Sequence, residues 1–261
     1  MNPLLTLVFV VGAVLALGRG LDLGLWTDLE SGLCMAGSVW WRYAALGAAV
    51  LIAVLAGRKL AHEPENLRNP CKYSGIFAAL AAGAFALAAV SRLALAVTGA
   101  GAVVRAVLEV LCAVWLALLA KSWRQKDWKL PTNSMASGVW GTLVFYWCLL
   151  SRFMENSSSW HRVTPTALVW ELLAALLFLS CLVRALWLPE TSDGKVLCAS
   201  GLAAFILCFC WELPQTLTLC MPSQFRVTNL PTIFFGLGLA CIGTLGMLCT
   251  VRTAGAAAKR R

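Results

Sequence analysis

Long runs of apolar residues, each about the length that crosses a bilayer as a helix, recur along the whole chain. A hydrocarbon core of about 30 Å needs roughly 20 apolar residues, because each helical residue adds about 1.5 Å. Short polar segments separate the runs. The pattern predicts eight spans, at residues 3–21, 40–57, 73–97, 101–120, 137–154, 165–186, 196–217 and 230–251.

These spans leave only short connections in a chain of 261 residues, so a soluble domain has no room. Composition agrees, because 13% of the residues are charged, about half the roughly 25% of ordinary soluble domains. We therefore expect a single transmembrane domain over residues 1–261. Its fold class is an all-α integral membrane protein, with a bundle of about eight transmembrane helices arranged as four helical hairpins. A water-soluble enzyme and a disordered chain are excluded.

Basic residues indicate the orientation of this bundle. Cytoplasmic connections collect Lys and Arg, which resist translocation. Fourteen of the 21 basic residues follow the even-numbered spans, in segments 58–72, 121–129, 184–195 and 252–261. We therefore expect both termini on the cytoplasmic side of a plasma or cytoplasmic membrane. The net charge of +9 then reflects orientation and contact with anionic lipid headgroups, and nucleic acid is not expected as a partner.

The opposite side of the membrane carries few basic residues. We expect Arg19 and Asp22 to lie there, in the loop where the first span ends. Trp26 falls at the same boundary, where amphipathic rings are common. Cys34 and Cys220 are also expected on this side, and the sequence leaves open whether they form a disulfide.

A spacing of 63 residues suggests an internal repeat. Ser74-Gly75, Ser137-Gly138 and Ser200-Gly201 open the third, fifth and seventh spans at this interval. The spacing favours a tandem repeat of two-helix hairpins in one orientation. Chance remains an alternative, because serine is a common residue at helix N-termini and a further Ser-Gly pair lies outside the series.

Seven ionisable residues within the spans all lie in the half away from the basic connections. A charge at the centre of a lipid-facing helix costs about 2.5–3.5 kcal/mol, so such groups should face the bundle interior and pair. Pro214 should also loosen the seventh span near Glu212, since it cannot donate to the carbonyl of Cys210. We expect a polar vestibule, open to the outside, whose candidate binding residues are Glu109, Glu171, Glu212, Arg92, Arg105, Arg152 and Arg42.

The leading functional hypothesis is the binding or transport of a small polar or anionic solute. Arg92 and Arg105 would be its charge partners, and the glutamates would set the local field or relay protons. The same residues could instead hold helices together, with Arg42 and Arg152 reaching the headgroups. That interpretation favours a membrane sensor or an assembly subunit that docks a partner helix or a second copy of the chain.

An integral membrane enzyme is a third hypothesis, but the sequence contains no recognisable catalytic motif and predicts no catalytic residue. The 11 cysteines include no Cys-x-x-Cys pair, the spacing that is common in zinc sites. We therefore expect neither a metal nor a cofactor.

Overall fold

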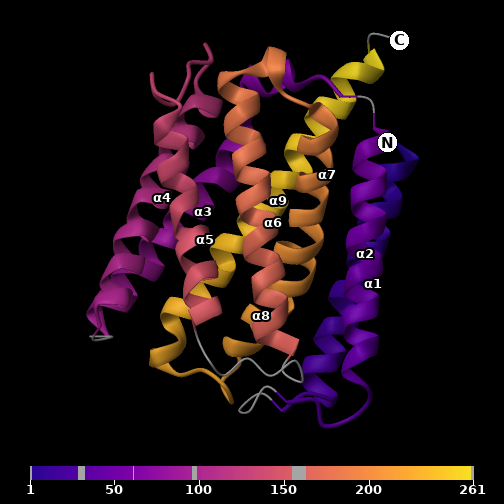
Figure 1. The fold of residues 1–261 in the computed structure, drawn as a ribbon, viewed down its shortest axis with the longest axis vertical. Coiled ribbons are helices and arrows are strands. Elements are labelled where there is room, and N and C mark those ends of the chain that lie inside the picture. The colour runs from indigo at the N-terminus through magenta and orange to yellow at the C-terminus, as the bar shows by residue number, and fades with distance from the viewer. Residues whose placement is uncertain (1, 29–32, 61, 96–98, 155–162, 260–261) are drawn as a thin grey trace.

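The computed structural model describes residues 2–28, 33–60, 62–95, 99–154 and 163–259, which form a bundle of long helices (Figure 1). The α-helices are α1 (Pro3–Leu25), α2 (Val39–Lys59), α3 (Lys72–Ala94), α4 (Ala100–Arg124), α5 (Ala136–Met154), α6 (Val163–Trp187), α7 (Gly194–Ala204), α8 (Glu212–Leu219) and α9 (Leu230–Lys259). A π-helical segment, η3 (Phe205–Trp211), joins α7 to α8. Short 3-10 turns are η1 (Pro64–Arg68), η2 (Pro189–Thr191) and η4 (Val227–Asn229).

Seven helical segments in the described residues are long and apolar enough to cross a membrane. They are α1, α2, α3, α4, α6, the continuous segment Gly194–Leu219, and Val227–Gly255. Large apolar side chains cover the outside of the bundle: Leu17 is 71% exposed, Trp41 77% and Phe153 75%. A surface of this kind suits lipid rather than water, so the structure supports a helical integral membrane protein in contact with the bilayer.

The helices are arranged with the α1–α2 pair at one edge of the bundle and the α3–α4 pair at the other (Figure 1). α3 packs on α4 and α9, α2 packs on α7, and α1 contacts α8. The first turn of α1 and the last turns of α9 lie at the same end of the bundle. We call the opposite end, where α1 ends and α2 begins, the distal end.

Aromatic and small side chains make up the core. Phe85 of α3 meets the rings of Phe145 and Phe235 edge-on, with centroids 5.8 and 5.4 Å apart, and so links α3 to α5 and α9. Trp115 of α4 is 2% exposed and lies against Gly141 of α5, where a Cβ atom would be 2.4 Å from its ring. Glycine is needed here because the indole occupies the space of a side chain.

Close backbone contact joins α2 to α7. A Cβ atom at Gly57 would lie 2.5 Å from the Cα atom of Ala199, which is closer than atoms can pack. On the same helix, a Cβ atom at Gly47 would have no neighbouring atom within 4 Å. Small residues at such crossings allow membrane helices to associate through backbone contact.

We expect Gly57→Ala to destabilise the fold, because the added methyl group would push α2 away from α7. Overpacking of this kind typically costs about 1–3 kcal/mol. Thermal unfolding of the purified protein in lipid nanodiscs measures the effect. Gly47→Ala is the matched control, which should keep or slightly raise the melting temperature because alanine favours the helix. Equal melting temperatures for the two variants would contradict the close contact.

Candidate functional site

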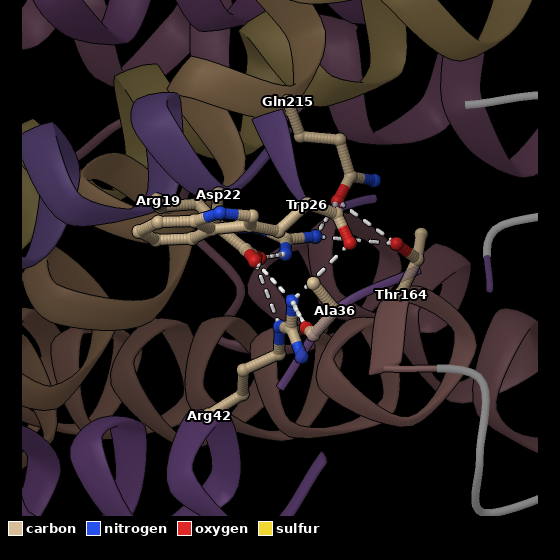
Figure 2. Close-up of polar contacts among 7 residues, drawn as sticks. All are labelled: Arg19, Asp22, Trp26, Ala36, Arg42, Thr164 and Gln215. Carbon is tan, nitrogen blue, oxygen red and sulfur yellow. Dashed lines mark hydrogen bonds and ion pairs between the residues drawn. The ribbon is translucent and has the colours of Figure 1, made fainter. Parts of the chain in front are cut away.

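Two arginines share one carboxylate at the distal end of α1 and α2. Asp22 Oδ2 accepts a hydrogen bond from Arg19 Nη1 at 2.6 Å, and Asp22 Oδ1 accepts two from Arg42, from Nη2 at 2.5 Å and Nε at 2.8 Å. Figure 2 shows Asp22 between the two guanidinium groups. Arg19 is 2% exposed and Asp22 7%. This cluster carries two positive charges and one negative charge, and we call it the Asp22 cluster.

Arg19 extends the Asp22 cluster toward α6 and α8. Its Nη2 donates to Gln215 Oε1 at 3.1 Å and to Thr164 Oγ1 at 3.3 Å (Figure 2). Its guanidinium also lies over the indole of Trp211, 4.4 Å from the ring centroid. A cation over an indole face is attracted to its electron density. Side chains from three separate helical segments therefore hold this one arginine.

Arg19 and Asp22 correct the sequence-based assignment, which placed both in a connection. They lie inside α1, which continues to Leu25. Opposite charges three residues apart share a helix face, so Arg19 and Asp22 pair. This pairing offsets the free-energy cost of placing each charge in the membrane, whereas the prediction treated the two charges separately and ended the span too early. Trp26, which marked the boundary in the sequence, caps this helix and was the signal that could have placed both residues inside it.

A second cluster lies at the distal end of α3 and α4. Arg92 holds Glu109 through two hydrogen bonds, Nη2 to Oε1 at 2.9 Å and Nε to Oε2 at 3.3 Å. Arg105 Nε donates to the same Oε1 at 3.0 Å, and its guanidinium lies 4.5 Å from the ring centroid of Phe235. Glu109 is fully buried. This Glu109 cluster repeats the composition of the Asp22 cluster, two arginines around one acid.

Two carboxyl groups meet between these clusters. Glu171 of α6 is 1% exposed and Glu212 of α8 is 5% exposed, and their side chains lie within hydrogen-bonding reach of each other. Thr216 Oγ1 donates to Glu212 Oε1 at 3.0 Å. The Oε2 atoms of both glutamates are buried and have no hydrogen-bond partner among the described residues. We call Glu171 and Glu212 the carboxyl pair.

The backbone around the carboxyl pair is irregular in a way that fits its sequence. The π-helical segment η3 ends at Trp211, directly before Glu212 and three residues before Pro214. This agrees with the expected loosening of the helix near Pro214. Gly236 of α9 makes the necessary room, since a Cβ atom there would lie 2.6 Å from Glu212 Oε1.

A cavity of about 520 Å³ lies against the Asp22 cluster. Arg19, Asp22 and Arg42 line it, together with the indoles of Trp26, Trp41 and Trp211 and with small or apolar residues of α1, of α2 and of the segment directly before α2. A second hollow of about 830 Å³ follows α3 and α4 and is lined mainly by alanines, with Lys121 and Arg124 at one end. Only the first cavity is adjacent to buried charge.

The residues proposed from the sequence thus fall into three places. Arg92, Arg105 and Glu109 meet in one cluster, Glu171 and Glu212 form the carboxyl pair, and Arg42 joins the Asp22 cluster, whose other members the sequence did not single out. Arg152 lies near enough to the Cys148 thiol to interact with it electrostatically. Of the seven, Arg42 alone lines the cavity of the Asp22 cluster.

The remaining sequence-based candidates concern cysteine chemistry. Cys34 and Cys220 are free thiols, so the disulfide that the sequence left open is not formed. The described residues contain no group of three or more His, Cys, Asp or Glu side chains that could hold a metal ion.

Comparisons with protein families, with curated proteins and with solved structures found no match to this chain.

We expect Asp22→Asn to destabilise the protein strongly. The amide keeps the size of the carboxylate but leaves Arg19 and Arg42 without a counter-charge, and removing one partner of a buried ion pair costs about 3–5 kcal/mol. Thermal unfolding in nanodiscs provides the measurement. Asp127→Asn, at an exposed position, removes the same charge and should leave the melting temperature unchanged. Similar losses in both variants would contradict the role of the Asp22 cluster.

Proposed function

We propose that the chain crosses the membrane eight times, with both ends on the cytoplasmic side and the distal end outside. Because α1 begins and α9 ends at the same end of the bundle (Figure 1), the number of crossings must be even. The eighth crossing is α5, whose 19 residues extend about 28 Å. It contains Trp140, Tyr146 and Arg152, and it is not among the seven segments that are long and apolar enough by themselves.

The eight crossings form four hairpins, of which three share a packing feature at the repeated Ser-Gly pairs. A Cβ atom at Gly75 would lie 3.2 Å from Ala120 O, one at Gly138 2.6 Å from Val183 Cγ2, and one at Gly201 2.8 Å from Gly246 O. In each case the contact is with the next spanning helix of the same hairpin. A common packing role at a constant spacing supports duplication of one hairpin unit.

The proposed function is the binding or transport of a small anionic solute in the cavity of the Asp22 cluster. The observation that carries it is the excess of positive charge on an apolar cavity, where two guanidinium groups share one carboxylate. Arginine binds carboxylate or phosphate through paired hydrogen bonds, and more strongly away from water. The volume of about 520 Å³ lies within the usual range of ligand sites, roughly 300–1,000 Å³.

The cavity walls narrow the class of solute. Apart from the charged residues and Ser38, the lining consists of aliphatic side chains, glycine and three indoles. A solute that fits both the arginines and the apolar walls of the cavity would carry one anionic group and a short apolar chain, as a medium-chain carboxylate does. Its anionic group would compete with Asp22 for Arg42, and its chain would lie against Trp41 and Trp211.

A sensor or assembly subunit is the second candidate. The hollow along α3 and α4 favours it, because a surface of alanine and glycine lets a helix from another chain approach closely. Such a protein would use the Asp22 and Glu109 clusters only to hold its hairpins together. It would bind no solute at the distal end, which separates this candidate from the first.

We expect octanoate to bind to the purified protein in nanodiscs and to raise its melting temperature progressively as its concentration increases. Octylammonium, with the same chain and the opposite charge, should give no shift. Arg42→Gln should weaken octanoate binding at least about tenfold, the value of one charge-assisted hydrogen bond. The melting temperature of each variant is measured with and without octanoate, so that a change in the stability of the unliganded protein does not affect the comparison.

Arg58→Gln is the control for this experiment, because it removes a positive charge from the exposed end of the same helix, α2. It should bind octanoate like the unmodified protein. An equal response to octanoate and octylammonium would reflect partition into lipid and would contradict the proposed site.

The orientation can be measured with thiols. Cys220, a free and exposed thiol at the distal end, should react with a membrane-impermeant maleimide on intact cells, and Cys220→Ser should lose that labelling. Cys71, at the start of α3, lies at the other end and should react only after permeabilisation. Labelling of Cys71 but not Cys220 on intact cells would reverse the orientation.

A further inference from the structure

The carboxyl pair has an unusual set of contacts for two acids inside a membrane bundle. Glu171 and Glu212 are both nine-tenths buried or more, and the arginines nearby are engaged elsewhere. The hydrogen bonds of Arg19 go to Asp22, Thr164 and Gln215. In the described residues, no cation forms an ion pair with either glutamate, whereas Asp22 and Glu109 each have two such partners.

Hydrogen-bond accounting shows what the pair lacks. An ionised carboxylate only accepts hydrogen bonds, so two facing carboxylates repel each other and satisfy nothing. The Oε2 atoms of Glu171 and Glu212 are both buried without a partner. One proton on either residue supplies an O–H donor to the facing oxygen and removes the repulsion. A buried polar atom left without a partner costs about 1–3 kcal/mol, so the bundle geometry favours the protonated pair.

Few other groups can compensate the charge of the pair. From α1, the guanidinium of Arg19 is close enough to interact electrostatically with both glutamates. From η3, the Cys208 thiol is close enough to interact with both, and it donates to the backbone carbonyl of Glu171. From α8, Thr216 donates its single hydroxyl hydrogen to Glu212, while α9 contributes Gly236, which has no side chain.

Arg19 also belongs to the proposed solute site, and it therefore connects the two. It lines the cavity, holds Asp22 and lies over Trp211, which is the residue before Glu212. The formal charges of Arg19, Arg42, Asp22 and the carboxyl pair add up to zero when the pair holds one proton. A bound anion would make it negative by one, and a second proton on the pair would restore neutrality. Uncompensated charge in such surroundings is costly, so the two binding events should favour each other.

We propose that Glu171 and Glu212 form a proton-binding site that holds one proton between them and takes up a second when an anion occupies the cavity of the Asp22 cluster. The first part stands on the geometry of the pair alone, and the second rests on the proposed function. Each proton comes from a hydronium ion in the solution at the distal end: an O–H bond of hydronium breaks, an O–H bond to a carboxylate oxygen forms, and a water molecule is left behind. Anion and proton would then move as an electroneutral combination.

Infrared spectroscopy of the full chain in nanodiscs tests the first part. A protonated carboxyl group has a C=O stretching band that shifts in D₂O and that ionised carboxylates lack. Near pH 7 ordinary Asp and Glu side chains are ionised, so we expect a band from one carboxyl group per protein. Glu171→Gln and Glu212→Gln should each remove or shift it. Glu65→Gln, at an exposed position of η1, should leave it unchanged.

The unmodified protein alone can overturn the proton site, whether or not the variants fold. Absence of the band at pH 7 would overturn it, and so would a band that both glutamine variants retain unchanged. Addition of octanoate with a ¹³C carboxyl group, whose own carbonyl band is displaced, tests the coupling. We expect the intensity to rise from one carboxyl group to two, and a variant that combines Glu171→Gln with Glu212→Gln to show neither the band nor the rise.

The outcomes separate this inference from the proposed function. Octanoate that binds without changing the band would overturn the coupling and leave the solute site in place. A band assigned to the pair in a protein that does not bind octanoate would support the proton site and overturn the proposed function instead.

Discussion

The need to neutralise charge inside an apolar bundle determines how the distal end is built. Asp22 and Glu109 each hold two guanidinium groups, and in both cases the three side chains come from the two helices of one hairpin. The net gain from such pairs is small, because desolvation opposes it, but an alternative packing that separated them would be very unfavourable. The clusters therefore specify which helices are paired and at what height.

Much of the fold could be predicted from the sequence, since long apolar runs indicate spanning helices directly. Helix ends were harder: Arg19 and Asp22 resemble loop residues when each is scored as a single charge in lipid, and only their pairing allows α1 to continue to Leu25. The span predicted at residues 137–154 coincides with α5, which runs from Ala136 to Met154.

The candidate site was predictable only where partners are close in sequence. Arg105 and Glu109 are one helical turn apart, so their pairing follows from helix geometry. Arg42 and Asp22 are 20 residues apart, and Glu171 and Glu212 are brought together by the packing of α6 on the segment that contains η3. No local pattern encodes these contacts. They depend on small residues such as Gly236, whose role appears only when the neighbouring helix is in place.

The uneven distribution of charge along the spans has an electrical consequence. Between the clusters at the distal end and the basic residues at the other, segments such as 43–57, 110–120 and 230–251 contain no charged residue. An ion-free layer behaves as a dielectric, so most of a transmembrane voltage must fall across it. Each elementary charge that crosses that layer gains or loses about 2.3 kcal/mol per 100 mV. The carboxyl pair and the arginines would then share nearly the potential of the solution at the distal end, and in the proposed function the membrane voltage would act on the passage of a solute rather than on its binding.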